Sequence, residues 1–205
     1  MSFYINLDSR EDRKMQFEEE CKKMNIQVER FSAIKHNIGG IGCNESHLTL
    51  LKKARDLKLE SVTIFEDDFI FLISPEEYSQ ILSNLPSDYD VVMLSYNIIK
   101  SEPYNEMFGK VIDNQTASGY IVHSRFYEKL IDTWEEGLRL FKDNPTHISS
   151  YVCDMYWKRL QPTSNWYYSL KRVGKQSVGF SDSMNCVVDY QCLSLIHISE
   201  PTRPY

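Results

Sequence analysis

The sequence lacks the features that mark membrane-spanning, exported, disulfide-bonded and nucleic-acid-binding proteins. No apolar run approaches the roughly 18 residues that cross a bilayer, and no basic and then apolar leader opens the chain. Lys and Arg total 23 against 29 Asp and Glu, a net charge of -6, so the excess positive charge that binds a phosphate backbone is missing. The five cysteines form no C-x-x-C pair, unlike a disulfide framework or a zinc knuckle. We expect a cytoplasmic protein with reduced thiols, no transmembrane segment and no nucleic-acid partner.

What is present is typical of one globular domain. Hydrophobic residues make up 42% and aromatic residues 13% of the 205, which is enough to pack a core. The end of the chain is different: residues 193–205 (LSLIHISEPTRPY) do not continue the preceding pattern. Their first eleven residues match the translation of a transposon-end adapter used in sequencing libraries. We therefore expect a domain over residues 1–192 that is truncated at its C-terminus, followed by a non-native tail.

Strand and helix patterns alternate along the chain, which predicts an α/β domain with a mostly parallel central sheet flanked by helices. Residues 37–42 (NIGGIG) predict a glycine-rich turn before one of the helices. Strands are expected over residues 3–7, 26–34, 62–65, 90–95, 118–123 and 166–170. One helix is expected to end at residue 25 and another to begin at residue 74. Three further helices are expected over residues 43–59, 124–141 and 149–160.

The most informative segment is residues 62–69 (VTIFEDDF), in which an apolar strand ends in three carboxylates. Three adjacent negative charges must be solvated, paired or bound to a cation. If the strand geometry continues, Glu66 and Asp68 point the same way and Asp67 points to the other face. Oxygen ligands at the carboxyl end of a parallel strand suit Mg²⁺ or Mn²⁺. A plain acidic turn is the alternative.

The chain resembles glycosyltransferase family 25, the lipopolysaccharide and collagen glycosyltransferase group. No single motif decides this, but the matches occur in family order over residues 3 to 182. They are residues 5–13 (INLDSREDR), 42–48 (GCNESHL), 65–68 (FEDD), 90–94 (DVVML), 119–122 (GYIV), 154–157 (DMYW) and 176–182 (QSVGFSD).

The resemblance implies a GT-A type, nucleotide-diphospho-sugar transferase fold. It also implies metal-dependent, inverting transfer of galactose or glucose from a UDP-sugar to a hydroxyl of a glycan, lipooligosaccharide or protein. Glu66 and Asp68 would hold the Mn²⁺ or Mg²⁺, with Asp68 the more direct ligand, and Asp67 would lie nearer the donor ribose or sugar. Peripheral association with a membrane that carries the acceptor is a further expectation.

Two further groups are candidates for the donor site. One follows the first expected strand and comprises Asn6, Asp8, Arg10 and Arg13, with Arg13 favoured for a diphosphate or base contact because guanidinium presents a planar donor fork. Arg10 and Arg13 could instead form local ion pairs with Glu11 or Asp12.

The other group is Ser46 and His47, near an expected helix start, where backbone N–H groups favour anions. Ser46 could also be a capping or packing hydroxyl, and His47 a structural histidine. The resemblance favours a donor-site role for His47 rather than a role as a base.

Inverting transfer needs a general base near the acceptor hydroxyl. Asp154 is the first candidate, because it lies among Tyr151, Tyr156 and Trp157, and aromatic faces commonly carry sugar rings. Trp157 itself is expected in the core. Asp182 is the second candidate. Because the family's last elements extend beyond residue 182, a late metal ligand would be missing from this chain.

Two other functions remain open at this point. A metal-dependent phosphoryl-transfer or phosphodiesterase enzyme also uses carboxylates at strand ends, but it usually binds a second metal ion. The sequence has only one acidic cluster of this kind. A non-catalytic, sugar-binding remnant of the transferase fold is the other alternative.

Overall fold

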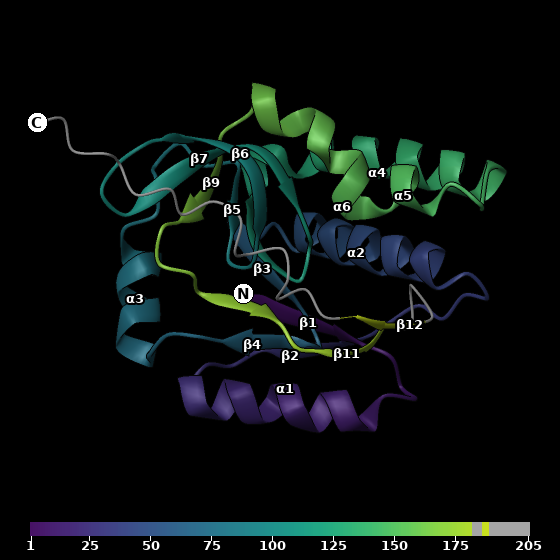
Figure 1. The fold of residues 1–205 in the computed structure, drawn as a ribbon, viewed down its shortest axis with the longest axis horizontal. Helices are drawn as coiled ribbons and strands as arrows, with labels where there is room; N and C mark the ends of the chain where they lie inside the picture. Colours follow the sequence, from purple (N-terminus) through teal and green to yellow (C-terminus); the bar gives the residue numbers. More distant parts are fainter. Residues whose placement is uncertain (182–185, 189–205) are drawn as a thin grey trace, which may run out of the picture.

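The computed structural model describes residues 1–181 and 186–188, and it has a large sheet between two layers of helices (Figure 1). Within these residues the sheet has eight strands in the order β2-β1-β3-β8-β5-β9-β7-β6. The pairings make β8 and β7 antiparallel to the other six strands. The expected α/β class with a mostly parallel sheet is therefore confirmed. The sequence does not predict that two of the strands are antiparallel.

The strands and helices have the following bounds. The strands of the large sheet are β1 (Ser2–Asn6), β2 (Glu29–Ser32), β3 (Ser61–Glu66), β5 (Val91–Met93), β6 (Asn97–Pro103), β7 (Phe108–Gln115), β8 (Gly119–His123) and β9 (Trp166–Ser169). Two small sheets pair β4 (Phe69–Phe71) with β10 (Gly174–Gln176), and β11 (Gly179–Ser181) with β12 (Cys186–Val188). The helices are α1 (Glu11–Met24), α2 (Gly39–Asp56), α3 (Pro75–Ser83), α4 (Tyr127–Asp143), α5 (Ile148–Tyr151) and α6 (Cys153–Tyr156), with 3₁₀ turns η1 (Ser124–Phe126) and η2 (Trp157–Thr163).

Alternation along the strands builds one hydrophobic core on each face of the sheet. In β3, Ile64 packs in the core that includes α2 and α4, whereas Phe65 packs in the core that includes α1 and α3. Figure 1 shows α1 on one side of the sheet, with α2 and α4 on the other. Glu66 is the next residue after Phe65, so its side chain returns to the face that α2 covers.

Local signals in the sequence predict several element ends correctly. The expected start of α3 is a capping box in which the Ser74 hydroxyl accepts from Glu77 N and the Glu77 carboxylate accepts from Ser74 N. Asn25 ends α1 in the left-handed conformation, with φ 51°.

Other expectations are wrong in their bounds. The turn expected over residues 37–42 is partly helical, because α2 already begins at Gly39. Gly42 permits this: a Cβ there would lie 2.4 Å from the Ile34 carbonyl oxygen. The helix expected over 149–160 is divided into α5, α6 and η2, because Val152 is extended, with ψ 151°. The β6–β7 hairpin was not expected at all.

Candidate active site

A cavity of about 620 Å³ lies at the carboxyl ends of β1 and β3 and is bordered by the start of α2 and by α5 and α6. Open α/β sheets bind their ligands at this edge. Several candidate residues from distant parts of the sequence line the cavity together. They are Arg13, Ser46, His47, Glu66, Asp67, Asp68 and Asp154.

Two of the three carboxylates at the end of β3 share one guanidinium. Arg13 Nη1 donates to Asp67 Oδ1 at 3.0 Å and to Asp68 Oδ2 at 3.3 Å. Arg13 therefore pairs with the carboxylate cluster and not with the neighbouring acids of α1. Because the strand ends at Glu66 and the chain then turns, Asp67 also borders the cavity, in contrast to its expected place on the opposite face.

Asp68 is the least compensated of the three carboxylates. It is only 8% exposed, and its Oδ1 has no hydrogen-bond partner among the described residues. Burial, together with the nearby Glu66 carboxylate, raises the pKa of Asp68 to about 8. An unpartnered, buried oxygen on a carboxylate that has other carboxylates nearby is a position that a cation can occupy.

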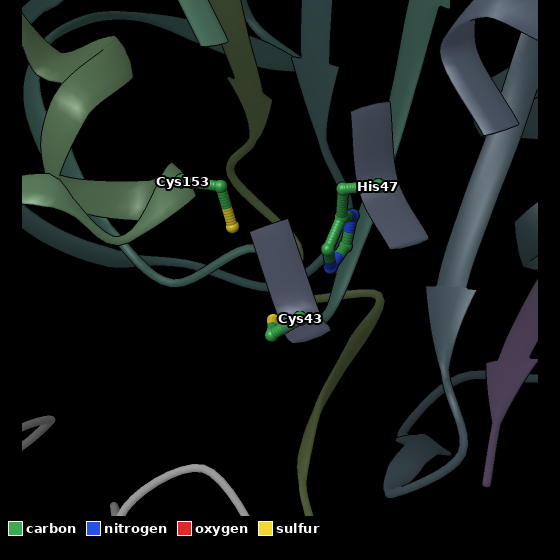
Figure 2. Close-up of side chains that lie close together, drawn as sticks. All are labelled: Cys43, His47 and Cys153. Carbon is green, nitrogen blue, oxygen red and sulfur yellow. The ribbon is translucent and has the colours of Figure 1, made fainter. Parts of the chain in front are cut away.

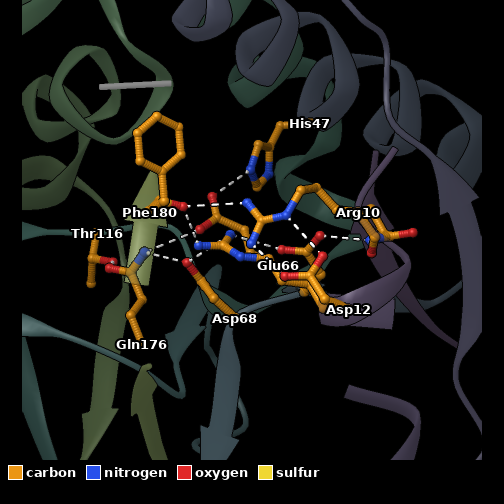
Figure 3. Close-up of polar contacts among 11 residues, drawn as sticks. Arg10, Asp12, His47, Glu66, Asp68, Thr116, Gln176 and Phe180 are labelled. Carbon is orange, nitrogen blue, oxygen red and sulfur yellow. Dashed lines mark hydrogen bonds and ion pairs between the residues drawn. The ribbon is translucent and has the colours of Figure 1, made fainter. Parts of the chain in front are cut away.

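Gln176 joins the two carboxylates that were expected to bind metal. Its Nε2 donates to Glu66 Oε2 at 3.3 Å and to Asp68 Oδ2 at 3.5 Å (Figure 3). Its Oε1 accepts from the Thr116 hydroxyl at 2.9 Å. The sequence places Gln176 in a motif but does not assign it to the site. The antiparallel pairing of β10 with β4, the strand that follows the acidic turn, brings it there.

His47 is fully buried and lies between two polar partners. Its Nδ1 is 2.7 Å from the Tyr120 hydroxyl, and its Nε2 is 3.2 Å from Glu66 Oε1. Burial opposes the charged imidazolium, but hydrogen bonds to Cys43 and Glu66 outweigh it and raise the pKa of His47. The ring thereby fixes the position of the Glu66 carboxylate.

Asp154 lies on α6, where one of its oxygens accepts from Thr116 N at 3.1 Å. Burial raises the pKa of Asp154 to about 6 despite that hydrogen bond. Trp157, three residues further on, is fully buried among core side chains, as expected. The second candidate, Asp182, lies outside the described residues, as does the tail over 193–205.

The other candidates near the first strand are not among the residues that line the cavity. Asn6 donates to Asp67 Oδ2 at 2.7 Å from a position only 1% exposed. Asp8 is exposed, and hydrogen bonds from Arg30 and Ser32 lower its pKa.

Arg10 and Ser46 are engaged within the fold. Arg10 forms a bidentate ion pair with Asp12, from Nε to Oδ1 at 3.0 Å and from Nη2 to Oδ2 at 2.9 Å. This is the local ion pair that the sequence suggests as an alternative. The Ser46 hydroxyl donates to Gly42 O and accepts from Ile34 N. It thereby fastens the first turn of α2 to the segment after β2.

Comparison with known proteins agrees with the resemblance seen in the motifs. Residues 37–137 match the family model of glycosyltransferase family 25, described as LPS biosynthesis protein. The chain is also 32% identical over 93 residues to a Haemophilus influenzae protein named "Putative glycosyltransferase". The match covers 45% of the chain and 30% of that protein, so it spans less than a third of the relative's length. Both matches support assignment of the chain to glycosyltransferase family 25.

Solved structures share the fold of this chain at low sequence identity. A glycosyltransferase involved in glycosylation of the major capsid of PBCV-1 superposes with a TM-score of 0.54 at 9% identity, covering 90% of this chain and 95% of that one. A197 from STIV superposes with a TM-score of 0.50 at 14% identity, covering 91% and 92%. At these identities the likeness shows the fold alone. Among the described residues, no helix is both long enough and apolar enough to span a membrane.

Proposed function

We propose that this chain transfers a hexose, galactose or glucose, from a UDP-sugar to a hydroxyl acceptor, with a divalent cation at Glu66 and Asp68. One observation carries the proposal: these two carboxylates meet at Gln176 Nε2, while Asp68 keeps one oxygen buried and unpartnered within the described residues. Carboxylate oxygens without sulfur or nitrogen ligands fit Mn²⁺ or Mg²⁺.

The donor diphosphate would lie against the acidic turn. When bound, the divalent cation would neutralise the charge that develops on the departing diphosphate. Arg13, already in contact with Asp67 and Asp68, adds a fixed positive charge beside it. Asn6 holds Asp67, which we assign to the donor ribose or sugar.

Asp154 is the proposed general base at the acceptor side of the same cavity. The acceptor oxygen would form a bond to the anomeric carbon as the bond from that carbon to the diphosphate oxygen breaks. Asp154 would take the proton of the acceptor hydroxyl. Attack from the face opposite the diphosphate inverts the anomeric configuration. The backbone N–H of Thr116 orients the carboxylate for this proton transfer.

The acceptor is proposed to be a glycan or lipooligosaccharide, with a protein hydroxyl as the second possibility. The family description as an LPS biosynthesis protein supports the first. The structurally similar enzyme that acts in capsid glycosylation is consistent with the second. A lipid-linked acceptor would place the protein beside a membrane on its cytoplasmic side.

Isothermal titration calorimetry with UDP, with and without Mn²⁺, tests the proposal on the whole chain. We expect UDP to bind only when Mn²⁺ is present. Asp68→Asn should abolish this Mn²⁺-dependent binding. Asp132→Asn, which changes an exposed carboxylate on α4, is the matched control. UDP affinity that is equal with and without Mn²⁺ would contradict the cation site.

Product analysis separates transfer from the phosphodiesterase alternative. With a UDP-hexose and a glycan acceptor, transfer gives UDP and an extended glycan. A phosphodiesterase would give UMP and a sugar phosphate without any acceptor. A sugar-binding remnant would bind the donor and give neither product.

A further inference from the structure

A second group of metal-ligating side chains lies beside the carboxylates and has a different chemistry. Cys43, His47 and Cys153 each offer one ligand atom, and these atoms all lie within 4.8 Å of one another (Figure 2). Cys43 and His47 are four residues apart on α2, so they share one face of the helix. Cys153 is the first residue of α6.

The fold holds the two thiols in this arrangement. Asn44, next to Cys43, is buried and accepts from Cys153 N at 2.7 Å while its Nδ2 donates to Tyr151 O at 2.8 Å. On the other side, Trp134 Nε1 donates to Cys153 O at 3.2 Å. The Asn44 hydrogen bonds fasten the start of α6 to α2, and the Trp134 hydrogen bond fastens it to α4. The two cysteines are therefore positioned before any ligand arrives.

We propose that Cys43, His47 and Cys153 form a site for Zn²⁺ or a similar thiophilic cation. It would adjoin the Mn²⁺ or Mg²⁺ site at Glu66 and Asp68, because His47 Nε2 lies 3.2 Å from Glu66 Oε1. Two thiolates and an imidazole are ligands that Zn²⁺ prefers, whereas hard cations prefer oxygen. Tetrahedral Zn²⁺ sites have Zn–S distances of about 2.3 Å and Zn–N distances of about 2.0 Å, so their ligand atoms are roughly 3.5–3.8 Å apart. The ligand atoms therefore need to approach one another by only about 1 Å.

Both cysteines line the cavity, so the fourth position on the metal would face it and could take a water molecule. Binding would join α2 to the segment that carries Asp154 and should stabilise the fold, because the unfolded chain does not hold the three ligands together. This inference does not depend on the transferase reaction, and its test measures no activity.

Titration of the reduced 205-residue chain with Co²⁺, a spectroscopic substitute for Zn²⁺, tests the site. We expect a thiolate-to-cobalt charge-transfer band that saturates at one equivalent and disappears when Zn²⁺ is added. Zn²⁺ should also raise the melting temperature. Cys43→Ser with Cys153→Ser should remove the band, whereas Cys21→Ser, which changes a buried thiol on α1, should keep it. Asp68→Asn should keep it as well, because Asp68 is not one of the three ligands.

Two results would overturn the proposal. One is the absence of a charge-transfer band in the wild-type chain. The other is a band that survives in the double variant, since Cys186 and Cys192 remain there and would then be its source. If the double variant does not fold, as judged by circular dichroism, alkylation of the wild-type chain decides the question. Zn²⁺ should slow iodoacetamide labelling of Cys43 and Cys153 at least tenfold, and unchanged labelling would refute the site.

Discussion

Asn6 Nδ2 donates a 2.7 Å hydrogen bond to Asp67 Oδ2, although the two residues are 61 positions apart in the sequence. Parallel pairing of β1 with β3 brings the two strand ends together. Without this donor, Asp67 would be a buried carboxylate held by Arg13 alone among the contacts described here. The first strand therefore contributes to the acidic turn by positioning one of its carboxylates.

Asn6→Ala should destabilise the chain by about 1–3 kcal/mol, because it removes a donor from a buried charged acceptor. Asn6→Asp has nearly the same shape but adds a carboxylate, so we expect a larger loss of stability. Urea unfolding measures both. Equal stability of Asn6→Asp and the wild-type chain would show that the hydrogen bond does not position Asp67.

Stability without divalent cations should fall as pH rises from about 5 to 8. The pKa of folded Asp68 is raised to about 8, above its ordinary value of 3.8, so the folded state binds a proton that the unfolded state has already released. One such group changes stability by at most about 1.4 kcal/mol per pH unit. Urea unfolding in EDTA should show a shallower slope for Asp68→Asn. Mn²⁺ should flatten the wild-type slope, and identical slopes for both chains would contradict the prediction.

Gln176→Ala should weaken Mn²⁺-dependent UDP binding about 10-fold or more, as losses of residues that position metal ligands commonly do. Thr116→Val is the matched variant, because it removes only the hydroxyl that donates to Gln176 Oε1. We expect it to have a smaller effect in the same calorimetric titration. A Gln176→Ala chain with wild-type affinity would remove Gln176 from the site.

Asp154→Asn should lower kcat by about 10²–10⁴-fold with little change in the KM for the donor, because loss of a general base affects the reaction step. In the wild-type chain the rate should fall as pH drops below about 6, where Asp154 takes up a proton. Steady-state kinetics against pH checks both statements. Asp143→Asn, at an exposed position on α4, is the control, and an equal loss there would argue against a specific role for Asp154.

Gly42→Ala should destabilise the fold by about 1–3 kcal/mol, because the new methyl group would meet the Ile34 carbonyl oxygen at 2.4 Å. Gly179→Ala is the matched substitution, since its nearest neighbour would be Arg13 Nη2 at 3.7 Å. Thermal unfolding should separate the two variants clearly. Similar melting temperatures would mean that the start of α2 can move away from Ile34 without cost.

The sequence predicts the parts of this fold that depend on nearby residues. The strand that ends at Glu66 and the capping box at Ser74 need only local patterns, and both are present. The sequence predicts the start of α2 too late, because glycines usually mark turns. Gly42 is required instead because the Ile34 carbonyl oxygen lies too close for a side chain.

The candidate site was less predictable because its contacts link distant segments. The acidic turn stands out in the sequence as three adjacent carboxylates. Gln176 donates to both Glu66 and Asp68, which lie 110 and 108 positions earlier in the sequence. No local sequence pattern indicates these contacts. Cys43 and Cys153 look like unrelated thiols in the sequence, and the hydrogen bonds of Asn44 to Tyr151 and Cys153 help to bring them together.

The carbonyl oxygen of Phe180 accepts hydrogen bonds from both Arg10 and Arg13 (Figure 3). The segment that matches the family, residues 37–137, contains the acidic turn but not Arg13, Asp154, Gln176 or Phe180. An excised fragment of that length would carry the carboxylates without the groups that balance and orient them. We therefore expect cation affinity at the acidic turn to require the segments on both sides of residues 37–137. Its loss during stepwise unfolding would report when those segments separate from the turn.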